Sequence, residues 1–139
     1  MIVRLAKVSD KEAIFMLLEE LQEEVNKRYN VQHTVDKKAP TKLFEKILQR
    51  DDTKLFVVEN GKETVACATL HILPLLRHGE FRGWVDGFTV TKSKRRKGIG
   101  TLLLDEIKQY CSRNKINVIR LTSANELPRS RAARYQTTS

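Results

Sequence analysis

Hydrophobic and polar positions alternate over the first residues of the chain and then recur with the spacing of a helix. The segment IVRLA, residues 2–6, alternates as a short strand does. From about Ser9, where Ser9 and Glu12 have the spacing of a capping box, apolar residues fall on one helical face. This pattern predicts a strand followed by a helix. The opposite face carries glutamates that we expect to be solvated, namely Glu19, Glu20, Glu23 and Glu24.

The middle of the chain predicts a second helix and an antiparallel hairpin. After an aperiodic loop over residues 30–40, apolar residues at helical spacing indicate a helix that begins near Thr41 or the proline before it. Two β-rich runs then flank Asn60-Gly61, a dipeptide that accepts the positive φ angles of a tight turn. Strand patterns continue as far as WVDGFTV, residues 84–90.

The C-terminal third adds a helix, a strand and a short final helix. Apolar residues from Ile99 to Tyr110 recur at helical spacing, NVIRLTS (residues 117–123) is typical of a strand, and ELPRSRAARYQ (residues 126–136) suggests a short helix. The predicted order is βααββββαβα, an α/β fold of the α+β type with a mixed sheet. No internal repeat or low-complexity segment interrupts this order, so we expect residues 1–139 to form a single domain.

The formal net charge of +9 is concentrated at one end of the sequence. Residues 1–90 contain 14 Lys or Arg and 14 Asp or Glu, whereas residues 91–139 contain 12 and 3. This asymmetry favours a site for a polyanion, which could be nucleic acid, an anionic membrane or a phosphate-rich cofactor. No apolar run approaches the roughly 20 residues of a membrane span, and the N-terminus has no signal-peptide pattern. We therefore expect a cytoplasmic protein without a membrane partner.

The cysteines and histidines form no recognisable metal or redox pattern. Cys67 and Cys111 lack a CxxC partner, and His33, His71 and His78 lack metal-ligand spacing. We expect both cysteines to be reduced and structural, His71 and His78 to lie at the surface, and no metal to be bound.

Basic residues are densest immediately before a helix, in TKSKRRKGIGTLLLDEI, residues 91–107. Cations at a helix N-terminus are unfavourable unless an anion offsets them. Gly98 and Gly100 can turn successive backbone N–H groups toward one anion, and Thr101 adds a hydroxyl donor. Further phosphates could be held by Arg95, Arg96 and Lys97. Because the spacing fits neither GxxxxGK[ST] nor a three-glycine Rossmann fingerprint, we predict a pyrophosphate site of another kind.

The pattern Arg95-x-x-Gly98-x-Gly100, five residues after the strand-ending Val90, resembles motif A of the GCN5-related N-acetyltransferases, the GNAT superfamily. The strands and helices before it also follow an order similar to that of the family. The resemblance implies that the backbone amides of this loop bind the pyrophosphate of acetyl-coenzyme A, with the pantetheine arm along the preceding strand. The implied cofactor-binding residues are Phe88, Thr89, Val90, Arg95, Arg96, Lys97, Gly98, Ile99, Gly100, Thr101 and Asn125.

Near the C-terminus, Arg129-x-x-Ala132-Ala133-x-Tyr135-Gln136 resembles motif B of the family. Aligned on the alanines, Gln136 stands where many members have the tyrosine that protonates the leaving thiolate, whereas a one-residue shift would give that role to Tyr135. The family normally continues into a last strand beyond the QTTS with which this sequence ends. We therefore expect a GNAT-like sheet without that strand, whose edge is open to strand exchange or to a homodimer.

The resemblance also places Asp86 at a position that is often acidic in the family's fourth strand. An alkyl ammonium is almost fully protonated at pH 7, so acetyl transfer to it needs a base. Asp86 is the candidate, but a carboxylate needs burial or a relaying water for this task, and a surface or salt-bridged aspartate is the alternative. Gly87 suggests a β-bulge that would free a backbone N–H near Phe88 to Val90 for the thioester oxygen. Either Tyr135 or solvent would protonate the thiolate.

The sequence leaves three functions open. The favoured one is transfer of acetyl from acetyl-coenzyme A to a primary amine of a small molecule or protein, and it would be direct because neither cysteine has a recognisable nucleophile setting. A nucleic-acid-binding module could use KSKRRK and RSRAAR on phosphates, but the basic region has few aromatic residues for base stacking. A degenerate family member would bind acetyl-coenzyme A without catalysis.

Overall fold

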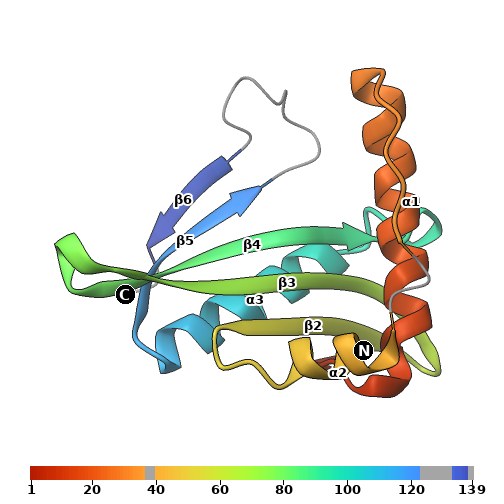
Figure 1. Ribbon diagram of the computed structural model, residues 1–139. Helices are drawn as coiled ribbons and strands as arrows, with labels where there is room; N and C mark the ends of the chain where they lie inside the picture. Colours follow the sequence, from red (N-terminus) through yellow and green to blue (C-terminus); the bar gives the residue numbers. More distant parts are fainter. Residues whose placement is uncertain (37–39, 123–132, 138–139) are drawn as a thin grey trace.

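The computed structural model describes residues 1–36, 40–122 and 133–137, and its framework is one mixed β-sheet (Figure 1). The six strands of the sheet lie side by side in sequence order. They are β1 (Ile2–Leu5), β2 (Thr53–Asn60), β3 (Glu63–Leu75), β4 (Glu80–Val90), β5 (Ile116–Thr122) and β6 (Ala133–Thr137). Neighbouring strands are antiparallel except β4 and β5, which are parallel. The predicted α/β fold class is confirmed.

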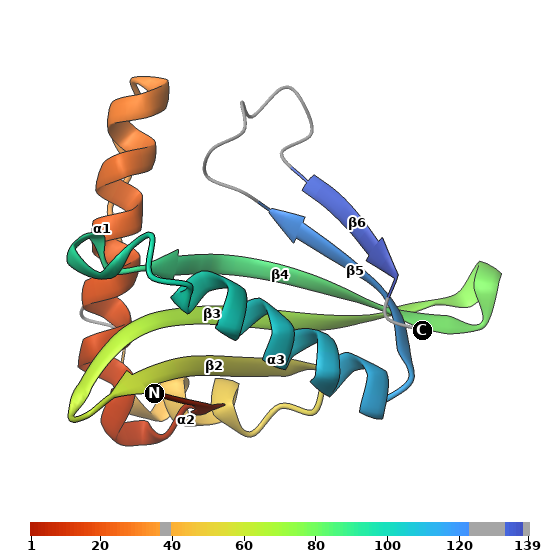
Figure 2. The same ribbon diagram turned by 180° about the vertical axis from the view of Figure 1, so that it is seen from behind.

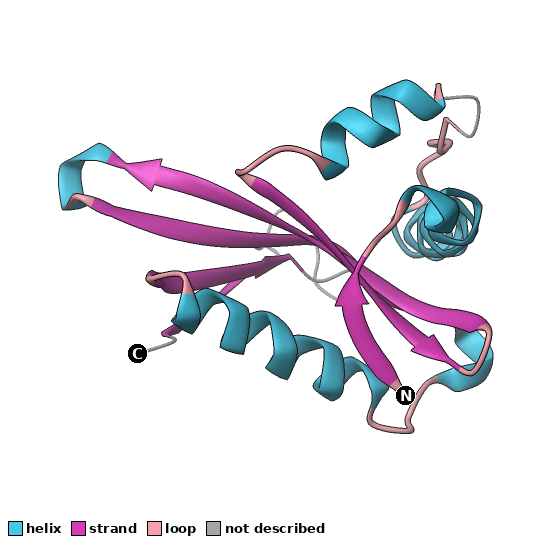
Figure 3. Cartoon of the chain, turned by 90° about the horizontal axis from the view of Figure 1, so that it is seen from below, coloured by secondary structure: helices cyan, strands magenta, loops and turns pink. Residues whose placement is uncertain are grey.

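In the described ranges, three α-helices cover the two faces of this sheet. Helices α1 (Lys11–Tyr29) and α2 (Thr41–Leu48) lie on one face, and α3 (Ile99–Arg113) lies on the other (Figures 2 and 3). Because α3 carries the chain from the end of β4 back to the start of β5, these two strands run in the same direction. Short 3-10 turns precede α1, join β3 to β4 and follow β4, as η1 (Val8–Asp10), η2 (Leu76–His78) and η3 (Lys92–Lys94).

The strands are apolar on both sides because both faces of the sheet are covered. In β2, Leu55 and Val57 pack in the core under α1 and α2, whereas Phe56 and Val58 pack in the core under α3. Helix α3 contributes Leu103, Ile107 and Cys111 to its core, all fully buried. The other core contains Ile14 and Leu17 of α1, Phe44 of α2 and Cys67 of β3.

Two details of the predicted order are wrong. The structure has three strands, not four, between α2 and α3, because residues 63–75 and 80–90 form two long strands joined by η2. Residues 133–136, predicted to end a helix, belong to β6, which pairs antiparallel with β5. The first part of that predicted helix, residues 126–132, lies outside the described residues. Strand β6 also covers the edge of β5 that was expected to be open, so the reason given for a homodimer does not hold there.

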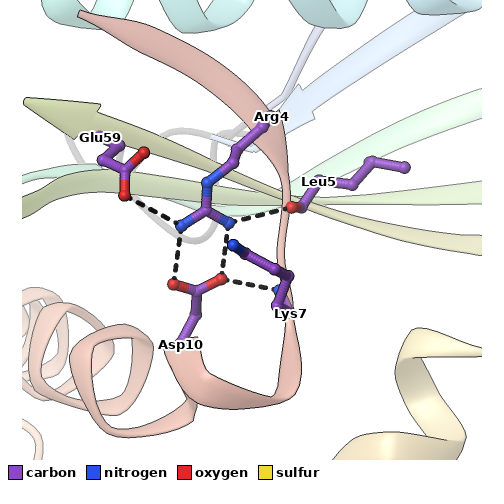
Figure 4. Close-up of polar contacts among 5 residues, drawn as sticks. All are labelled: Arg4, Leu5, Lys7, Asp10 and Glu59. Carbon is purple, nitrogen blue, oxygen red and sulfur yellow. Dashed lines mark hydrogen bonds and ion pairs between the residues drawn. The ribbon is translucent and has the colours of Figure 1, made fainter.

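A partly buried ion-pair cluster connects β1, β2 and the start of α1 (Figure 4). The Asp10 carboxylate, whose side chain is only 8% exposed, accepts hydrogen bonds from Nη1 and Nη2 of Arg4 at 2.8 and 3.0 Å. It also accepts the backbone N–H of Lys7 at 2.7 Å, and Arg4 reaches Glu59 at 3.5 Å. The hydrogen bonds from Arg4 lower the pKa of Asp10 against the opposing effect of burial.

We expect Asp10→Asn to weaken folding mainly above about pH 4. Because the pKa of Asp10 is lower in the folded protein, its ionised form stabilises the fold above the unfolded-state pKa of about 3.9, and this contribution is lost as pH falls through the folded-state pKa. The variant should lose about 2 kcal/mol of unfolding free energy at pH 7, as expected for charged hydrogen bonds. Its stability should then decline less than that of the wild type toward pH 3. Urea unfolding at both pH values measures this.

Asp52→Asn provides the matched control for this experiment. Asp52 forms a similar two-bond pair with Arg50, but both side chains are exposed. We therefore expect little change in stability at either pH. If the unfolding free energies of the wild type and of Asp10→Asn decreased equally between pH 7 and pH 3, the role assigned to Asp10 would be contradicted.

Candidate active site

The sheet separates between β4 and β5, at the carboxyl ends of the two parallel strands. Their pairing runs from Phe81 opposite Ile116 to Val85 opposite Leu121 and stops there. Strand β4 continues to Val90, and in Figure 1 the two strands diverge over this stretch. Residues 86–90 therefore pair with β3 on one side and have no β5 partner on the other.

A β-bulge lies where the strands separate, which confirms the sequence prediction at Gly87. Strand β3 pairs Thr69 with Asp86 and Cys67 with Thr89, so two β4 residues, Gly87 and Phe88, stand opposite one. Gly87 has a φ of 62°, and a Cβ there would come within 3.2 Å of Leu18 in α1. The positive φ favours glycine at this position, and the close approach of Leu18 leaves little space for a side chain.

The bulge and the strand register determine where the backbone donors of β4 point. The N–H of Thr91 donates to the carbonyl of Val65 in β3 at 2.8 Å. Because successive N–H groups of a strand point to opposite sides, the N–H of Val90 points away from β3, toward the side without a β5 partner. The N–H of Val90 therefore remains the candidate donor within the segment 88–90 that the sequence suggested.

The glycine-containing loop leads directly from β4 into α3. Gly98 is the N-cap of α3 with a φ of 81°, and Arg96 also has a positive φ, 63°. The first N–H groups of a helix have no partner within it, so α3 presents donors at this end. Open space surrounds the position of a Cβ on Gly98, and one on Gly100 would lie 3.6 Å from the ring of Phe88. The start of α3 therefore lies beside the separated end of β4.

The acidic face of α1 holds this loop, so the prediction that its glutamates are merely solvated is wrong for two of them. The guanidinium of Arg95 forms a two-bond pair with Glu24 and donates from Nε to the carbonyl of Val90 at 2.9 Å. Glu20 accepts the backbone N–H of Lys92 at 2.6 Å and the hydroxyl of Thr91 at 3.2 Å. The hydrogen bonds from Arg95 lower the pKa of Glu24, which keeps the pair ionised.

The predicted phosphate-binding residues therefore have different environments. Arg95 anchors the loop to α1, whereas Arg96 and Lys97 are exposed beside Gly98. Thr101 is exposed in the first turn of α3, and Ile99 is buried in the core beneath it. Asn125, predicted from the resemblance, lies outside the described residues.

A cavity of about 500 Å³ lies on the other side of the bulge, between the sheet and helices α1 and α2. Its apolar lining comes from α1, α2 and β2, and its polar lining includes residues of β3 and β4. The apolar residues are Ile14, Phe15, Leu18, Phe44, Ile47 and Leu55, and the polar residues are Arg50, Thr53, Thr69, His71 and Asp86. The cavity thus reaches Asp86, the residue at which β4 leaves β5.

Asp86 faces a histidine that the sequence analysis did not include in the site. Nε2 of His71 lies 3.8 Å from Oδ2 of Asp86, and both side chains line the cavity. Asp86 is 60% exposed, so the burial that would strengthen it as a base is absent. His71 was expected near a turn, but it lies within β3, opposite Trp84. Side chains two residues apart on a strand lie on the same face, so His71 could have been predicted to share the face of Thr69.

The residue predicted as the general acid lies elsewhere in the sheet. Tyr135 is in β6, opposite Arg120 of β5, rather than on a helix. Arg120 in turn lies opposite Trp84 of β4, and its guanidinium carbon is 5.6 Å from the centre of the Trp84 ring. The backbone of Tyr135 is therefore two strands away from β4.

The described part of the chain gives two further findings. No helix in it is both long and apolar enough to cross a membrane. It also contains no cluster of three or more His, Cys, Asp or Glu side chains that could hold a metal ion.

The architecture just described, with parallel strands that separate beside a glycine-capped helix, matches a known family. The sequence model of the acetyltransferase (GNAT) family matches residues 17–134. This chain belongs to that family and is a GNAT acetyltransferase. The family resemblance predicted from the sequence is confirmed.

Solved structures of acetyltransferases share the fold. The acetyltransferase from Vibrio fischeri is 18% identical, with a TM-score of 0.72 over 87% of this chain and 94% of that chain. Glucosamine-6-phosphate N-acetyltransferase from Arabidopsis thaliana is 21% identical, with a TM-score of 0.71 over 94% and 88%. Ribosomal-protein-alanine N-acetyltransferase from Brucella melitensis biovar Abortus 2308 is 18% identical, with a TM-score of 0.68 over 94% and 86%. At these identities the likeness concerns the fold, and comparison with curated protein sequences found no match.

Proposed function

We propose that this protein transfers the acetyl group of acetyl-coenzyme A directly to a primary amine. The observation that carries the proposal is the separation of β4 from β5 beyond Val85. The donors at the start of α3 lie by one side of it, and the cavity that contains Asp86 lies on the other. We propose that an activated thioester lies along this unpaired part of β4 and that the amine approaches it from the cavity.

The loop before α3 fits a diphosphate. It offers the unpaired N–H groups of a helix N-terminus, open space at Gly98, and the exposed cations Arg96 and Lys97. Glu24 and Glu20 hold the loop through Arg95 and Lys92, so these donors are positioned before any ligand arrives. When bound, acetyl-coenzyme A would supply an acetyl group that is activated as a thioester.

Asp86 and His71 are the groups proposed to prepare the amine. The exposed carboxylate of Asp86 can bind the ammonium form of the acceptor, which is the main form at pH 7. His71, 3.8 Å away, can accept the proton directly or through one water, because a neutral imidazole nitrogen is a hydrogen-bond acceptor and a common general base. The sequence-based assignment of Asp86 alone is thereby extended to a pair.

Backbone and solvent groups complete the proposed reaction. The N–H of Val90 is suited to the negative charge that develops on the thioester oxygen. The departing thiolate would take its proton from Tyr135 or from solvent. Burial raises the pKa of the Cys67 thiol to about 12 and that of Cys111 to about 11, so neither forms a thiolate readily and transfer needs no acyl-enzyme.

Thiol release tests the proposal. Incubated with acetyl-coenzyme A, the protein should release free coenzyme A only when a primary amine is present, and mass spectrometry should find that amine heavier by one acetyl group. Binding of acetyl-coenzyme A with no product from any amine would point instead to a degenerate family member. DNA binding that depends steeply on salt, without affinity for acetyl-coenzyme A, would favour a nucleic-acid-binding module.

A further inference from the structure

The cavity between the sheet and helices α1 and α2 has two chemically distinct parts. Its apolar part includes Phe15 of α1 and Phe44 of α2, whose ring centroids are 6.3 Å apart and inclined by 47°. Phe44 is buried in the core, and Ile47 follows it one turn later on the same lining. Two aromatic rings in this arrangement present faces and edges against which a third ring can pack.

The polar part of the cavity lies on the strands, next to the separation of β4 and β5. Thr69 and Asp86 are register partners on β3 and β4, and His71 lies two residues farther along β3. Asp86 carries the formal negative charge of the lining, since the other described lining residues are neutral apart from Arg50 and His71. An ammonium group would therefore be bound at this end, beside the place where β4 becomes unpaired.

The cation of the lining already has a carboxylate partner. The guanidinium of Arg50 donates to both carboxylate oxygens of Asp52, from Nε at 2.8 Å and from Nη2 at 2.9 Å. This pair is neutral as a unit. A phosphate or carboxylate on the acceptor would therefore meet Asp86 and would have to compete with Asp52 for the Arg50 guanidinium, which is unfavourable.

From these contacts we infer that the acceptor is a primary amine with an apolar, ring-sized body and no anionic group, of the arylalkylamine class. The ammonium lies at Asp86 and His71, and the ring packs against Phe15 and Phe44. The cavity volume of about 500 Å³ accommodates such a molecule. This inference rests on the proposed acetyl transfer and specifies its substrate.

Four matched compounds test the inference. Phenethylamine carries both features, ethylamine lacks the ring, phenylalanine adds a carboxylate, and 2-phenylethanol lacks the ammonium. In calorimetry with the wild-type protein, and in thiol release for the three amines, phenethylamine should be favoured over each of the others by at least roughly tenfold. The inference would be overturned if phenethylamine and ethylamine had equal affinities and equal rates of thiol release, or if phenylalanine were bound or acetylated better than phenethylamine.

A charge placed in the apolar wall provides the second test. Ile47→Lys introduces a cation at a partly exposed lining position of α2. It should lower the affinity for phenethylamine by about tenfold or more, and it should narrow the difference in affinity between phenethylamine and phenylalanine. Leu43→Lys, on the same helix but exposed and outside the lining, is the control and should change neither. The inference fails if both variants behave alike.

The outcomes separate this inference from the proposed function. If amines are acetylated without regard to the ring or the carboxylate, the function stands and the acceptor class is wrong. If phenethylamine binds with the expected preference and Ile47→Lys weakens it, but no acetyl group is transferred, the acceptor site is correct and the catalytic proposal is wrong.

Discussion

Gly98→Glu is expected to raise the Kd for acetyl-coenzyme A by at least about a hundredfold. The position faces open space at the start of α3, so the new carboxylate would occupy the place proposed for the diphosphate and repel it. A side chain at a φ of 81° also strains the loop, which would move the backbone donors. Isothermal titration calorimetry measures the loss.

Gly79→Glu is the matched control for this variant. Gly79 also has a positive φ, 62°, and open space around its Cβ position, but it lies in the hairpin between β3 and β4, at the far end of β4 from α3. The same strain and the same charge are introduced, so affinity for acetyl-coenzyme A should not change. Undiminished affinity of Gly98→Glu, with correct folding by circular dichroism, would contradict the proposed phosphate site.

Asp86→Asn and His71→Gln are each expected to lower kcat by roughly a hundredfold, the usual contribution of a positioned base. Both side chains are partly exposed, so these near-isosteric changes should leave the fold intact. Steady-state kinetics measures the loss in both variants.

The controls for the pair are His78→Gln and Asp105→Asn. His78 is exposed in the hairpin turn, and Asp105 is exposed on α3, so neither lies in the cavity. Both variants should retain the wild-type kcat. If His71→Gln also keeps the wild-type kcat, the proton acceptor is not His71, and Asp86 alone remains the candidate.

Sequence patterns predicted the features that depend only on neighbouring residues in the chain. The period of apolar residues located α1, α2 and α3, and the Asn60-Gly61 dipeptide located the turn between β2 and β3. The bulge at Gly87 was also suggested by the sequence, because glycine inside a strand often marks a bulge, although Gly83 in the same strand is regularly paired. The loop before α3 was found from its charge and its glycines together.

Features that depend on distant segments could not be derived in this way. Residues 133–137 contain Ala133 and Gln136, which suit a helix, but pairing with β5 makes the segment a strand. The partnership of Glu24 with Arg95 joins residues 71 positions apart. His71 became part of the candidate site only because the register of β3 and β4 brings it to Asp86.

Helix α1 contacts both the basic loop and the cavity. Its first turns supply Phe15 and Leu18 to the proposed acceptor cavity, and the turns that follow supply Glu20 and Glu24 to the basic loop. We expect a shift of α1 caused by one of the proposed ligands to alter the site of the other, so that each ligand changes the affinity for the other by the same factor.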